Sequence, residues 1–407
     1  MAQKLIEHGF EIVEFGTIAD IYIINTCTVT NIADRKSRQM ARRAKQLNPK
    51  SIVVAVGCYA QVAKSELEKI DEIDLILGNN EKNQIVKYLE NYNIEKKQEI
   101  IDIFSQKEYL EYGDITYTEK TRAVVKIQDG CDRFCTYCII PYARGRVRSR
   151  TVENILEEIK KNVENGIKEV VITGIHIASY GKDLNNISLI NLLESINQIP
   201  DLKRIRLGSL EPTIITDEFV TRLSKLEKIC HHFHLSLQSG CNDTLKRMNR
   251  RYTVEEFKKV IERLKRTYPE VAITTDIIVG FPGETEEEFE QTKKFLKDIK
   301  FYKMHVFKYS PRKGTKAATM NAQVSGEIKE KRSNELICIS NKNEQEYIEQ
   351  FIGKEMEVLL EEQEGDYIKG HTENYITVKI KANQGNENEL CTVKLQKRDG
   401  MELIGVV

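Results

Sequence analysis

Short apolar runs alternate with amphipathic segments along the first 90 residues. The apolar runs predict strands at 20–25, 52–56 and 74–77, and the segments around them predict helices at 1–8, 34–46 and 64–69. Apolar strands of this length, separated by helices, are typical of parallel βαβ units. We therefore expect an open parallel α/β domain over residues 1–95.

This pattern begins with a helix, whereas an open parallel sheet normally begins with a strand. The order predicts that one strand and its loop, about 15–20 residues by the length of a βα unit, are missing before Met1. A truncated start would explain that gap.

A second series of strands and helices begins at Arg122, after a polar segment over 96–120 that is typical of a linker. Its predicted strands lie at 124–128, 169–173, 204–207, 233–238, 272–279 and 304–309. Six repeats over about 200 residues favour an incomplete parallel barrel over 121–345, because a full eight-fold barrel typically needs about 250 residues. An open doubly wound sheet with the same alternation is the alternative.

The pattern changes once more after a predicted helix at 329–350. Strand-like alternation appears at 356–360, 375–380 and 391–395, with turn signals at Gly365-Asp366 and at Gly370. Short alternating strands with regular turns predict a small all-β barrel over residues 346–407.

The composition is that of a globular protein, with 40% hydrophobic and 30% charged residues and 62 basic side chains against 62 acidic ones. This balance excludes a simple polycation, and no apolar run reaches the length of about 18 residues that a membrane-spanning helix needs. The N-terminus has no basic stretch leading into an apolar segment, so we expect a cytoplasmic protein without a membrane partner. Nine cysteines in a reducing compartment indicate metal, cluster or catalytic roles rather than disulfides.

Three cysteines share one short loop after a predicted strand, in the order Cys131-x-x-x-Cys135-x-x-Cys138. Three thiolates leave a four-iron cluster with one iron open to a substrate or cofactor, whereas common structural zinc sites close all four positions. Reactive groups gather at the carboxyl ends of the strands in parallel barrels, which favours the cluster. A zinc site with a distant fourth ligand is the alternative.

Cys27 and Cys58 are 31 residues apart, which is about one βαβ unit, and each follows a predicted strand. Neighbouring parallel strands would place both thiols at one edge of the sheet, where open α/β sheets build their sites. Two unrelated packed thiols are the alternative. The isolated Cys230, Cys241 and Cys338 are expected to be ordinary packed thiols, as is Cys391.

Basic residues gather in two places. Residues 35–50 contain seven basic side chains and no acidic one, and Arg144, Arg146, Arg148 and Arg150 follow the cysteine loop at every second position. Such charge suits a phosphate-rich partner, but a solvated helix face, or pairing with local acids or with a bound carboxylate, would account for it as well. The predicted β module is acidic, with 13 acidic and 7 basic residues from Glu346 onward, so RNA binding there would need one particular face.

The cysteine spacing, with Tyr137 before the last cysteine, resembles the radical S-adenosylmethionine (SAM) superfamily. Five segments in the expected order resemble its methylthiotransferases, and the last one resembles a TRAM domain: Asn25–Thr30, Gly57–Gln61, Gly130–Arg150, Ile278–Thr285 and Gly370–Tyr375. The amino-acid sequences of the two N-terminal segments and of Thr173-Gly-Ile-His176 are most similar to those of the MtaB-type branch. That branch modifies threonylcarbamoyladenosine at position 37 of tRNA, beside the anticodon. The related branches act on isopentenyladenosine in tRNA or on an aspartate of a ribosomal protein.

The resemblance implies two [4Fe-4S] clusters and SAM. Cys131, Cys135 and Cys138 would bind the radical-SAM cluster, and Cys27 and Cys58 would bind the auxiliary cluster. The family uses three cysteines for that second cluster, so we expect the auxiliary cluster to be impaired in this chain.

Several further site residues follow from position and resemblance. Those expected to contact SAM are Tyr137, Gly174, Ser236, Gln238 and Gly280, with ordinary barrel packing as the alternative. His176, at a strand end, is the candidate substrate contact, whereas His231 and His232 are expected to be surface or packing residues.

The implied reaction cleaves SAM to a 5′-deoxyadenosyl radical, which takes hydrogen from carbon 2 of the adenine. Sulfur would come from the auxiliary cluster and the methyl group from a second SAM. The implied partners are the tRNA anticodon loop and an electron donor such as flavodoxin or ferredoxin. A zinc-stabilised RNA-binding protein without catalysis is the alternative of another class.

Overall fold

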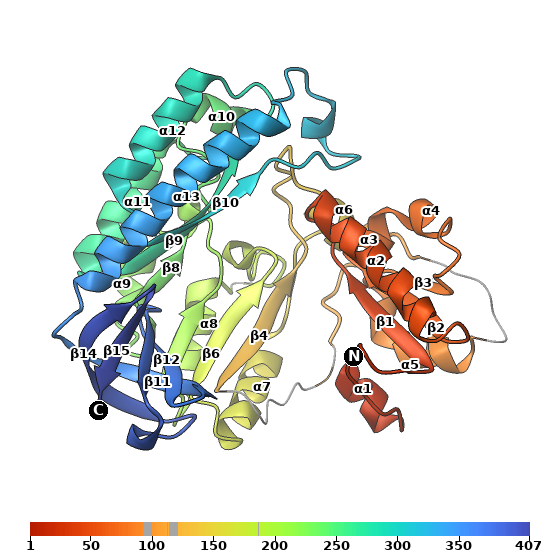
Figure 1. The fold of residues 1–407 in the computed structure, drawn as a ribbon, viewed down its shortest axis with the longest axis horizontal. Coiled ribbons are helices and arrows are strands. Elements are labelled where there is room, and N and C mark those ends of the chain that lie inside the picture. Colours follow the sequence, from red (N-terminus) through yellow and green to blue (C-terminus); the bar gives the residue numbers. More distant parts are fainter. Residues whose placement is uncertain (93–99, 112, 114–120, 186) are drawn as a thin grey trace. The chain divides into compact units, whose positions relative to one another are not determined.

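The computed structural model describes residues 1–92, 100–111, 113, 121–185 and 187–407, so 12 of the 25 residues of the predicted linker at 96–120 lie outside the described residues. The chain folds as two compact units (Figure 1). The first unit consists of Met1–Ile115, Asp129–Ser149 and Ser310–Thr319, and the second of Thr116–Gln128, Arg150–Tyr309 and Met320–Val407. The loop with three cysteines therefore belongs to the first unit. The domain boundaries expected near residues 95, 120 and 345 stay a prediction.

The first unit is built on a parallel sheet of β1 (Ile21–Thr26), β2 (Ile52–Gly57) and β3 (Leu75–Leu77), in the order β1-β2-β3. The predicted open parallel domain is confirmed. Its helices are α1 (Ala2–Glu7), α2 (Asn31–Leu47), α3 (Cys58–Val62), α4 (Lys64–Leu67), α5 (Ile85–Glu90) and α6 (Ile140–Arg144). Helix α2 begins three residues before the predicted start, because the Thr30 hydroxyl accepts a hydrogen bond from the Ala33 amide at 3.2 Å and caps the helix there.

The second unit contains six parallel strands that follow one another in chain order. They are β4 (Arg122–Asp129), β6 (Glu169–Gly174), β7 (Arg204–Leu207), β8 (His232–His234), β9 (Ala272–Val279) and β10 (Lys303–Lys308). Strands β4, β6 and β7 pair in that order, as do β8, β9 and β10, and isolated parallel bridges join the two groups, Ile205 with Ile229 and Leu210 with Leu235. Consecutive order is that of a partial barrel rather than of a doubly wound sheet, so the predicted fold class is confirmed.

Two expectations about this sheet need correction. The strand predicted at 233–238 is shorter, because β8 ends at His234 and only single bridges at Leu235 and Gln238 continue the pairing. The two-residue strand β5 (Arg148–Ser149) was not expected.

Amphipathic helices follow the central strands: α7 (Val152–Glu164), α8 (Leu189–Asn197), α9 (Asp217–Leu223), α10 (Asn242–Arg247), α11 (Val254–Thr267), α12 (Glu286–Ile299) and α13 (Gly326–Glu349). Capping boxes fix the starts of α11, at Thr253 and Glu256, and of α12, at Thr285 and Glu288. Helix α13 runs beside β10 (Figure 1), where the Ser340 hydroxyl accepts a hydrogen bond from the Met304 amide at 2.9 Å. None of the helices within the described ranges is both long and apolar enough to span a membrane.

The chain ends in a closed five-stranded barrel of β11 (Glu355–Glu364), β12 (Tyr367–Thr372), β13 (Thr377–Lys381), β14 (Leu390–Asp399) and β15 (Glu402–Val406). The predicted small β barrel is confirmed, and Gly365-Asp366 forms a turn as expected. Gly370 was expected to mark a turn but lies inside β12. A Cβ atom there would come within 2.2 Å of the Leu359 carbonyl oxygen, so glycine is needed for close strand packing.

A buried polar network joins this barrel to the amino ends of the central strands. The Arg206 guanidinium donates to both carboxylate oxygens of Glu169, at 2.7 and 3.3 Å, and to the Thr372 carbonyl oxygen at 3.3 Å. Arg204 donates to the carbonyl oxygens of His371 and Glu357. These contacts join the barrel to the sheet in addition to the apolar cluster in which Ala272 and Tyr302 pack with barrel residues.

Tyr375 completes this network. Its ring lies in stacking geometry against His232 and His371, with centroids 5.0 and 4.7 Å away, and the Arg206 guanidinium lies 4.6 Å from the ring centre. His231 is partly exposed, and its Nδ1 atom lies 3.1 Å from the Glu373 carboxylate. His231 and His232 are therefore surface and packing residues, as predicted.

Candidate active site

The three-cysteine loop is tight and largely buried. Cys131 and Cys135 are 9% exposed, and the Cys138 amide donates to the Cys135 carbonyl oxygen at 2.9 Å, which makes a tight turn. Gly130 has φ +75°, and a Cβ atom there would lie 1.7 Å from the Arg146 carbonyl oxygen, so the loop can close only with glycine at this position. Three thiols on one closed, largely buried loop suit a cluster with one open iron.

Cys27 and Cys58 lie at the same edge of the N-terminal sheet. The register of β1 and β2 pairs Thr26 with Gly57, and each cysteine is the next residue of its chain. The Thr26 hydroxyl donates to the Val56 carbonyl oxygen at 2.7 Å and accepts from the Ala60 amide at 3.2 Å, which joins the two strand ends. The expected placement at one edge is confirmed, while cluster ligation stays a prediction.

The two cysteine groups belong to one unit and are connected by side chains. Arg144, at the end of α6, donates through Nε to the Cys58 sulfur at 3.0 Å and through Nη1 to the Asp129 carboxylate at 3.3 Å. Asn79, after β3, lies 3.7 Å from the same sulfur and donates to the Ala143 carbonyl oxygen at 2.7 Å. The Cys58 sulfur is therefore held between a guanidinium and an amide group. Sequence reasoning did not assign this role to either residue.

The alternating arginines pair with local acids, the second explanation that the sequence allowed. Arg144 and Arg148 lie 3.3 and 3.9 Å from Asp129, and Arg146 lies 3.3 Å from Asp132. Arg150 pairs with the buried Glu158. These arginines therefore stabilise the loop and the sheet, and their charge is not a free phosphate-binding patch.

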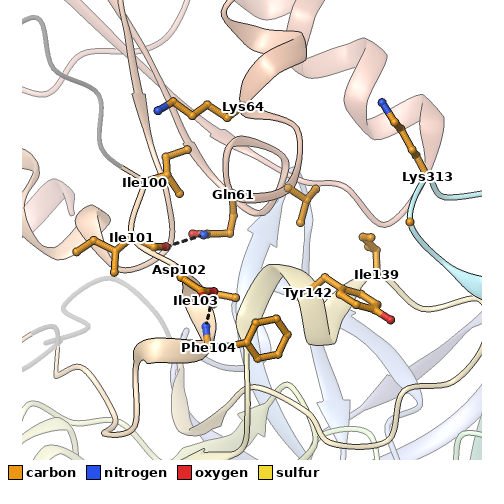
Figure 2. Close-up of a pocket in the computed structure, with 12 residues that line it drawn as sticks. Gln61, Lys64, Ile100, Ile101, Asp102, Ile103, Phe104, Ile139, Tyr142 and Lys313 are labelled. Atoms are coloured by element: carbon orange, nitrogen blue, oxygen red, sulfur yellow. Dashed lines mark hydrogen bonds between the residues drawn. The ribbon is translucent and has the colours of Figure 1, made fainter.

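A pocket of about 470 Å³ opens beside the same loop (Figure 2). Phe104 and Tyr142 contribute half-exposed aromatic rings, while Lys64 and Lys313 approach its rim. Gln61 donates to the Ile101 carbonyl oxygen at 3.1 Å and so holds one wall in place. The glutamine of the Gly57–Gln61 segment thus has a structural partner.

Four of the expected SAM contacts lie at the carboxyl edge of the central sheet. Gly174 ends β6, and Ser236, Gln238 and Gly280 follow β8 and β9. Gln238 has φ +74°, and its carbonyl oxygen accepts from the Ile278 amide at 2.9 Å, which brings it close to the start of the Gly280 turn. A Cβ atom at Gly280 would lie 2.3 Å from the Lys329 side chain, so packing alone requires glycine there. Tyr137 belongs to the first unit, and SAM contact stays a prediction for all five residues.

A polar network at this edge brings His176 and Ser236 together. The His176 ring lies 3.1 Å from the buried Glu211 carboxylate, and Glu211 lies 3.9 Å from Arg250. Arg250 and Tyr252 both donate to the Ser236 carbonyl oxygen, at 3.0 and 2.6 Å. Sequence reasoning missed Glu211, Arg250 and Tyr252, although Glu211 stands in the apolar stretch after a predicted strand and could have been noticed for that reason.

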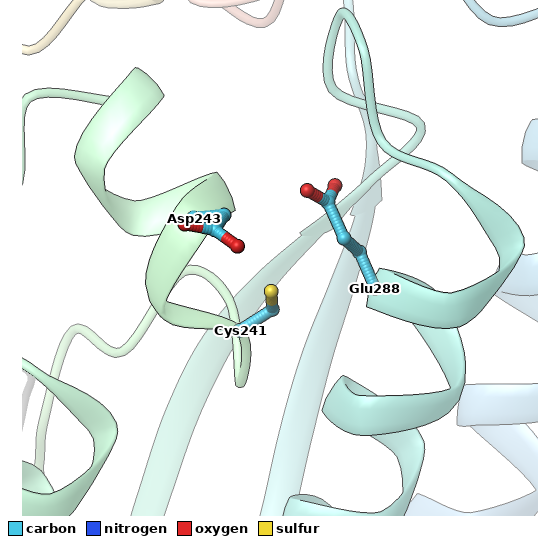
Figure 3. A group of neighbouring side chains, drawn as sticks. All are labelled: Cys241, Asp243 and Glu288. Carbon is cyan, nitrogen blue, oxygen red and sulfur yellow. The ribbon is translucent and has the colours of Figure 1, made fainter.

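A further group of possible metal ligands lies away from both cysteine groups. Cys241, Asp243 and Glu288 offer atoms within 4.8 Å of one another (Figure 3). Both oxygens of Glu288 already accept hydrogen bonds from Arg247, and Glu288 also caps α12. A cation would have to displace the Arg247 guanidinium, so this group is a capping and ion-pair cluster.

Comparison with known protein families identifies two regions of the chain. Residues 125–296 match the Radical SAM superfamily, and residues 1–78 match the family described as Uncharacterized protein family UPF0004. The fold is similar to a radical SAM methyltransferase, TsrM from Kitasatospora setae, with a TM-score of 0.54 at 16% identity over 75% of this chain and 64% of that protein. At this identity the likeness concerns the fold alone.

Curated relatives match almost the whole chain. The threonylcarbamoyladenosine tRNA methylthiotransferase MtaB of Bacillus subtilis is 41% identical over 399 residues, 96% of this chain and 88% of the relative. The protein of the same name from Aquifex aeolicus is 43% identical over 381 residues, 93% of this chain and 92% of the relative. A tRNA-2-methylthio-N(6)-dimethylallyladenosine synthase of Clostridium botulinum is 36% identical over 417 residues, which cover 100% of this chain and 92% of the relative. The chain therefore belongs to the family of radical SAM methylthiotransferases.

Proposed function

We propose that this enzyme adds a methylthio group to carbon 2 of threonylcarbamoyladenosine beside the anticodon of tRNA. The relatives with that printed activity are 41 and 43% identical to the chain, against 36% for the relative named for dimethylallyladenosine. These relatives are enzymes, which favours catalysis over the zinc-stabilised RNA-binding alternative. A methylthiotransferase for a ribosomal protein has less support, since the relatives compared are named for tRNA.

The observation that carries this proposal is that both cysteine groups belong to one compact unit. Methylthiolation needs SAM cleavage and sulfur delivery at one substrate atom, so the groups that support them must be held in a fixed arrangement. The Arg144 contact to the Cys58 sulfur and the Asn79 contact to the Ala143 carbonyl oxygen provide direct links between them.

The proposed ligands divide by position. Cys131, Cys135 and Cys138 would hold the radical-SAM cluster, and Cys27 and Cys58 would contribute two ligands to the auxiliary cluster. When bound, the first cluster and SAM supply the 5′-deoxyadenosyl radical. The residues of the chain orient these groups: the Arg144 guanidinium would hold the Cys58 sulfur, and Glu211 would fix the orientation of the His176 ring.

Helix α2 supports tRNA as the partner. Its acidic residue, Asp34, is buried and paired with Arg312, whereas Arg35, Lys36, Arg42 and Arg43 are exposed. An exposed row of cations with its acid turned inward suits an RNA backbone. An external electron donor such as flavodoxin or ferredoxin would complete the reaction in the cytoplasm.

The test is to supply the anaerobically reconstituted enzyme with SAM, a reductant and tRNA that carries threonylcarbamoyladenosine, and to analyse the digested nucleosides by mass spectrometry. We expect the 2-methylthio form of that nucleoside. A product only from tRNA carrying isopentenyladenosine, or only on a ribosomal protein, would replace the proposed substrate. Protein that takes up zinc and no iron would contradict the radical mechanism.

A further inference from the structure

The segment Ser310–Thr319, which we call the strap, follows β10 in the chain but belongs to the first unit. It reaches the loop after Cys27 through one buried side chain. The Arg312 guanidinium donates to the Thr28 hydroxyl and to the Asn31 amide oxygen, each at 2.5 Å, and pairs with the Asp34 carboxylate. Thr28 is fully buried and stands next to Cys27, so Arg312 fixes the backbone that carries this thiol.

The other end of the strap contacts the three-cysteine loop. The Ala317 amide donates to the Thr136 carbonyl oxygen at 2.8 Å, and Thr136 lies between Cys135 and Cys138. Between these two contacts, Lys313 and Gly314 line the pocket beside α6 (Figure 2). One segment of ten residues therefore touches both loops that carry cysteines.

We propose that the strap is a positioning element that sets the spacing between the Cys27 loop and the Cys135–Cys138 loop, with Arg312 as its main anchor. This inference rests on the proposed function, because spacing matters only if the two loops hold groups that act on one substrate.

The chemistry of the anchor makes it a rigid one. Arg312 and Asp34 are both largely buried, with 7% of each residue exposed. A buried guanidinium with three oxygen partners in a fixed planar arrangement permits little rotation, and a buried charge pair strongly resists the loss of one partner. Lys316, which is also in the strap, differs because it is exposed on the surface.

The test compares Arg312→Gln with Lys316→Gln in the whole chain, as anaerobically reconstituted enzyme. Three quantities are measured: bound iron per chain, 5′-deoxyadenosine formed from SAM, and methylthio product per 5′-deoxyadenosine. For Arg312→Gln we expect SAM cleavage to stay within about twofold of wild type, while product per cleavage falls about tenfold or more, since a misplacement of about 1 Å can cost about 100-fold. Lys316→Gln should match wild type in all three.

Arg312→Lys and Asn31→Ala keep the test decisive if Arg312→Gln fails to fold. Lysine retains the charge without the planar fork, and Asn31→Ala removes one acceptor, so both should lower product per cleavage by a smaller factor and leave the electron paramagnetic resonance signal of the cluster on the three-cysteine loop unchanged. An unchanged product-to-cleavage ratio in Arg312→Gln, with wild type active, would overturn the strap proposal alone. Wild-type enzyme that cleaves SAM without methylthiolating tRNA would overturn the proposed function instead.

Discussion

The two ends of the parallel strands carry different kinds of polar residue. At the carboxyl ends stand the thiols Cys27, Cys58 and Cys131 and the His176–Glu211 pair. At the amino ends of the central strands stand the buried ion pair of Arg206 and Glu169 and the ring of Tyr375.

The difference shows how to separate chemistry from support in this fold. At the amino ends, the charges of Arg206 and Glu169 satisfy each other and the backbone of the C-terminal barrel, which leaves them no capacity for a ligand. At the carboxyl ends, sulfur atoms and an imidazole are presented by loops. Substitutions at the carboxyl ends should therefore lower activity and leave stability unchanged. Substitutions at the amino ends should lower stability and leave the activity of the folded protein unchanged.

The largest effect is expected at the carboxyl end of β4. Cys135→Ala removes one of three sulfur atoms from the buried loop, so bound iron should fall and 5′-deoxyadenosine formation should drop to background. The measurement is anaerobic SAM cleavage together with iron content. Cys338→Ala, at an exposed cysteine of α13, is the control and should behave like wild type. Normal SAM cleavage by Cys135→Ala would remove this loop from the active site.

The second effect separates the two cysteine groups. Cys58→Ala should stop methylthiolation while SAM cleavage continues, because Cys58 lies outside the three-cysteine loop. Cys58→Ser keeps an acceptor for Arg144 and should show the same loss, which distinguishes a missing sulfur from a displaced arginine. Equal loss of SAM cleavage and methylthiolation in both variants would mean that the two groups do not act separately.

The third effect concerns the amino ends. Arg206→Met leaves the buried Glu169 carboxylate without its nearest cation, which should lower the free energy of unfolding by about 3–5 kcal/mol. Urea unfolding would measure the loss, and SAM cleavage by the folded fraction should persist. The matched control is Arg222→Met, which breaks the partly exposed pair with Glu194 and should cost much less. Equal costs for the two variants would contradict a structural role for the buried network.

The smallest effect is a pH dependence at the same end. Burial, with the nearby Arg206, holds the pKa of His232 well below its usual value of 6.5. The unfolded chain then binds a proton that the folded chain rejects, so stability should fall as pH drops below about 6.5, by up to about 1.4 kcal/mol per pH unit. His232→Phe should flatten this part of the curve in urea unfolding at several pH values. A curve identical to that of wild type would exclude His232 as a source of the dependence.

Local patterns were enough to predict the parallel strands, apart from β5 and the true length of β8, and the three-cysteine loop, whereas β12 and β15 of the C-terminal barrel were missed. The alternation of apolar runs and helices determines parallel order, and parallel order alone brings the ends of β1 and β2 together at Cys27 and Cys58. Helix α3 was missed, because it starts at Cys58 itself, directly after Gly57 with φ +101°. A five-residue helix has too few positions to show a period.

Contacts between distant residues could not be predicted. Arg206 lies in β7, where arginine alternates with apolar residues, a pattern that is typical of a strand with one exposed face. It is buried because the C-terminal barrel covers that face. Arg312 looks like an ordinary loop arginine until the fold brings it to Asp34. In both cases the partner, not the local sequence, decides the burial.

The strap also has a consequence for the order in which the chain matures. Asp34 and Arg312 are 278 residues apart. At about 5–20 residues per second, a ribosome needs about 14–56 s to travel that distance. During this interval the loop beside Cys27 exists without its anchor, while the whole central sheet is being synthesised. The sheet of β1, β2 and β3 is thus translated well before the strap that completes its unit, which postpones the final geometry of this loop until the central strands have been synthesised.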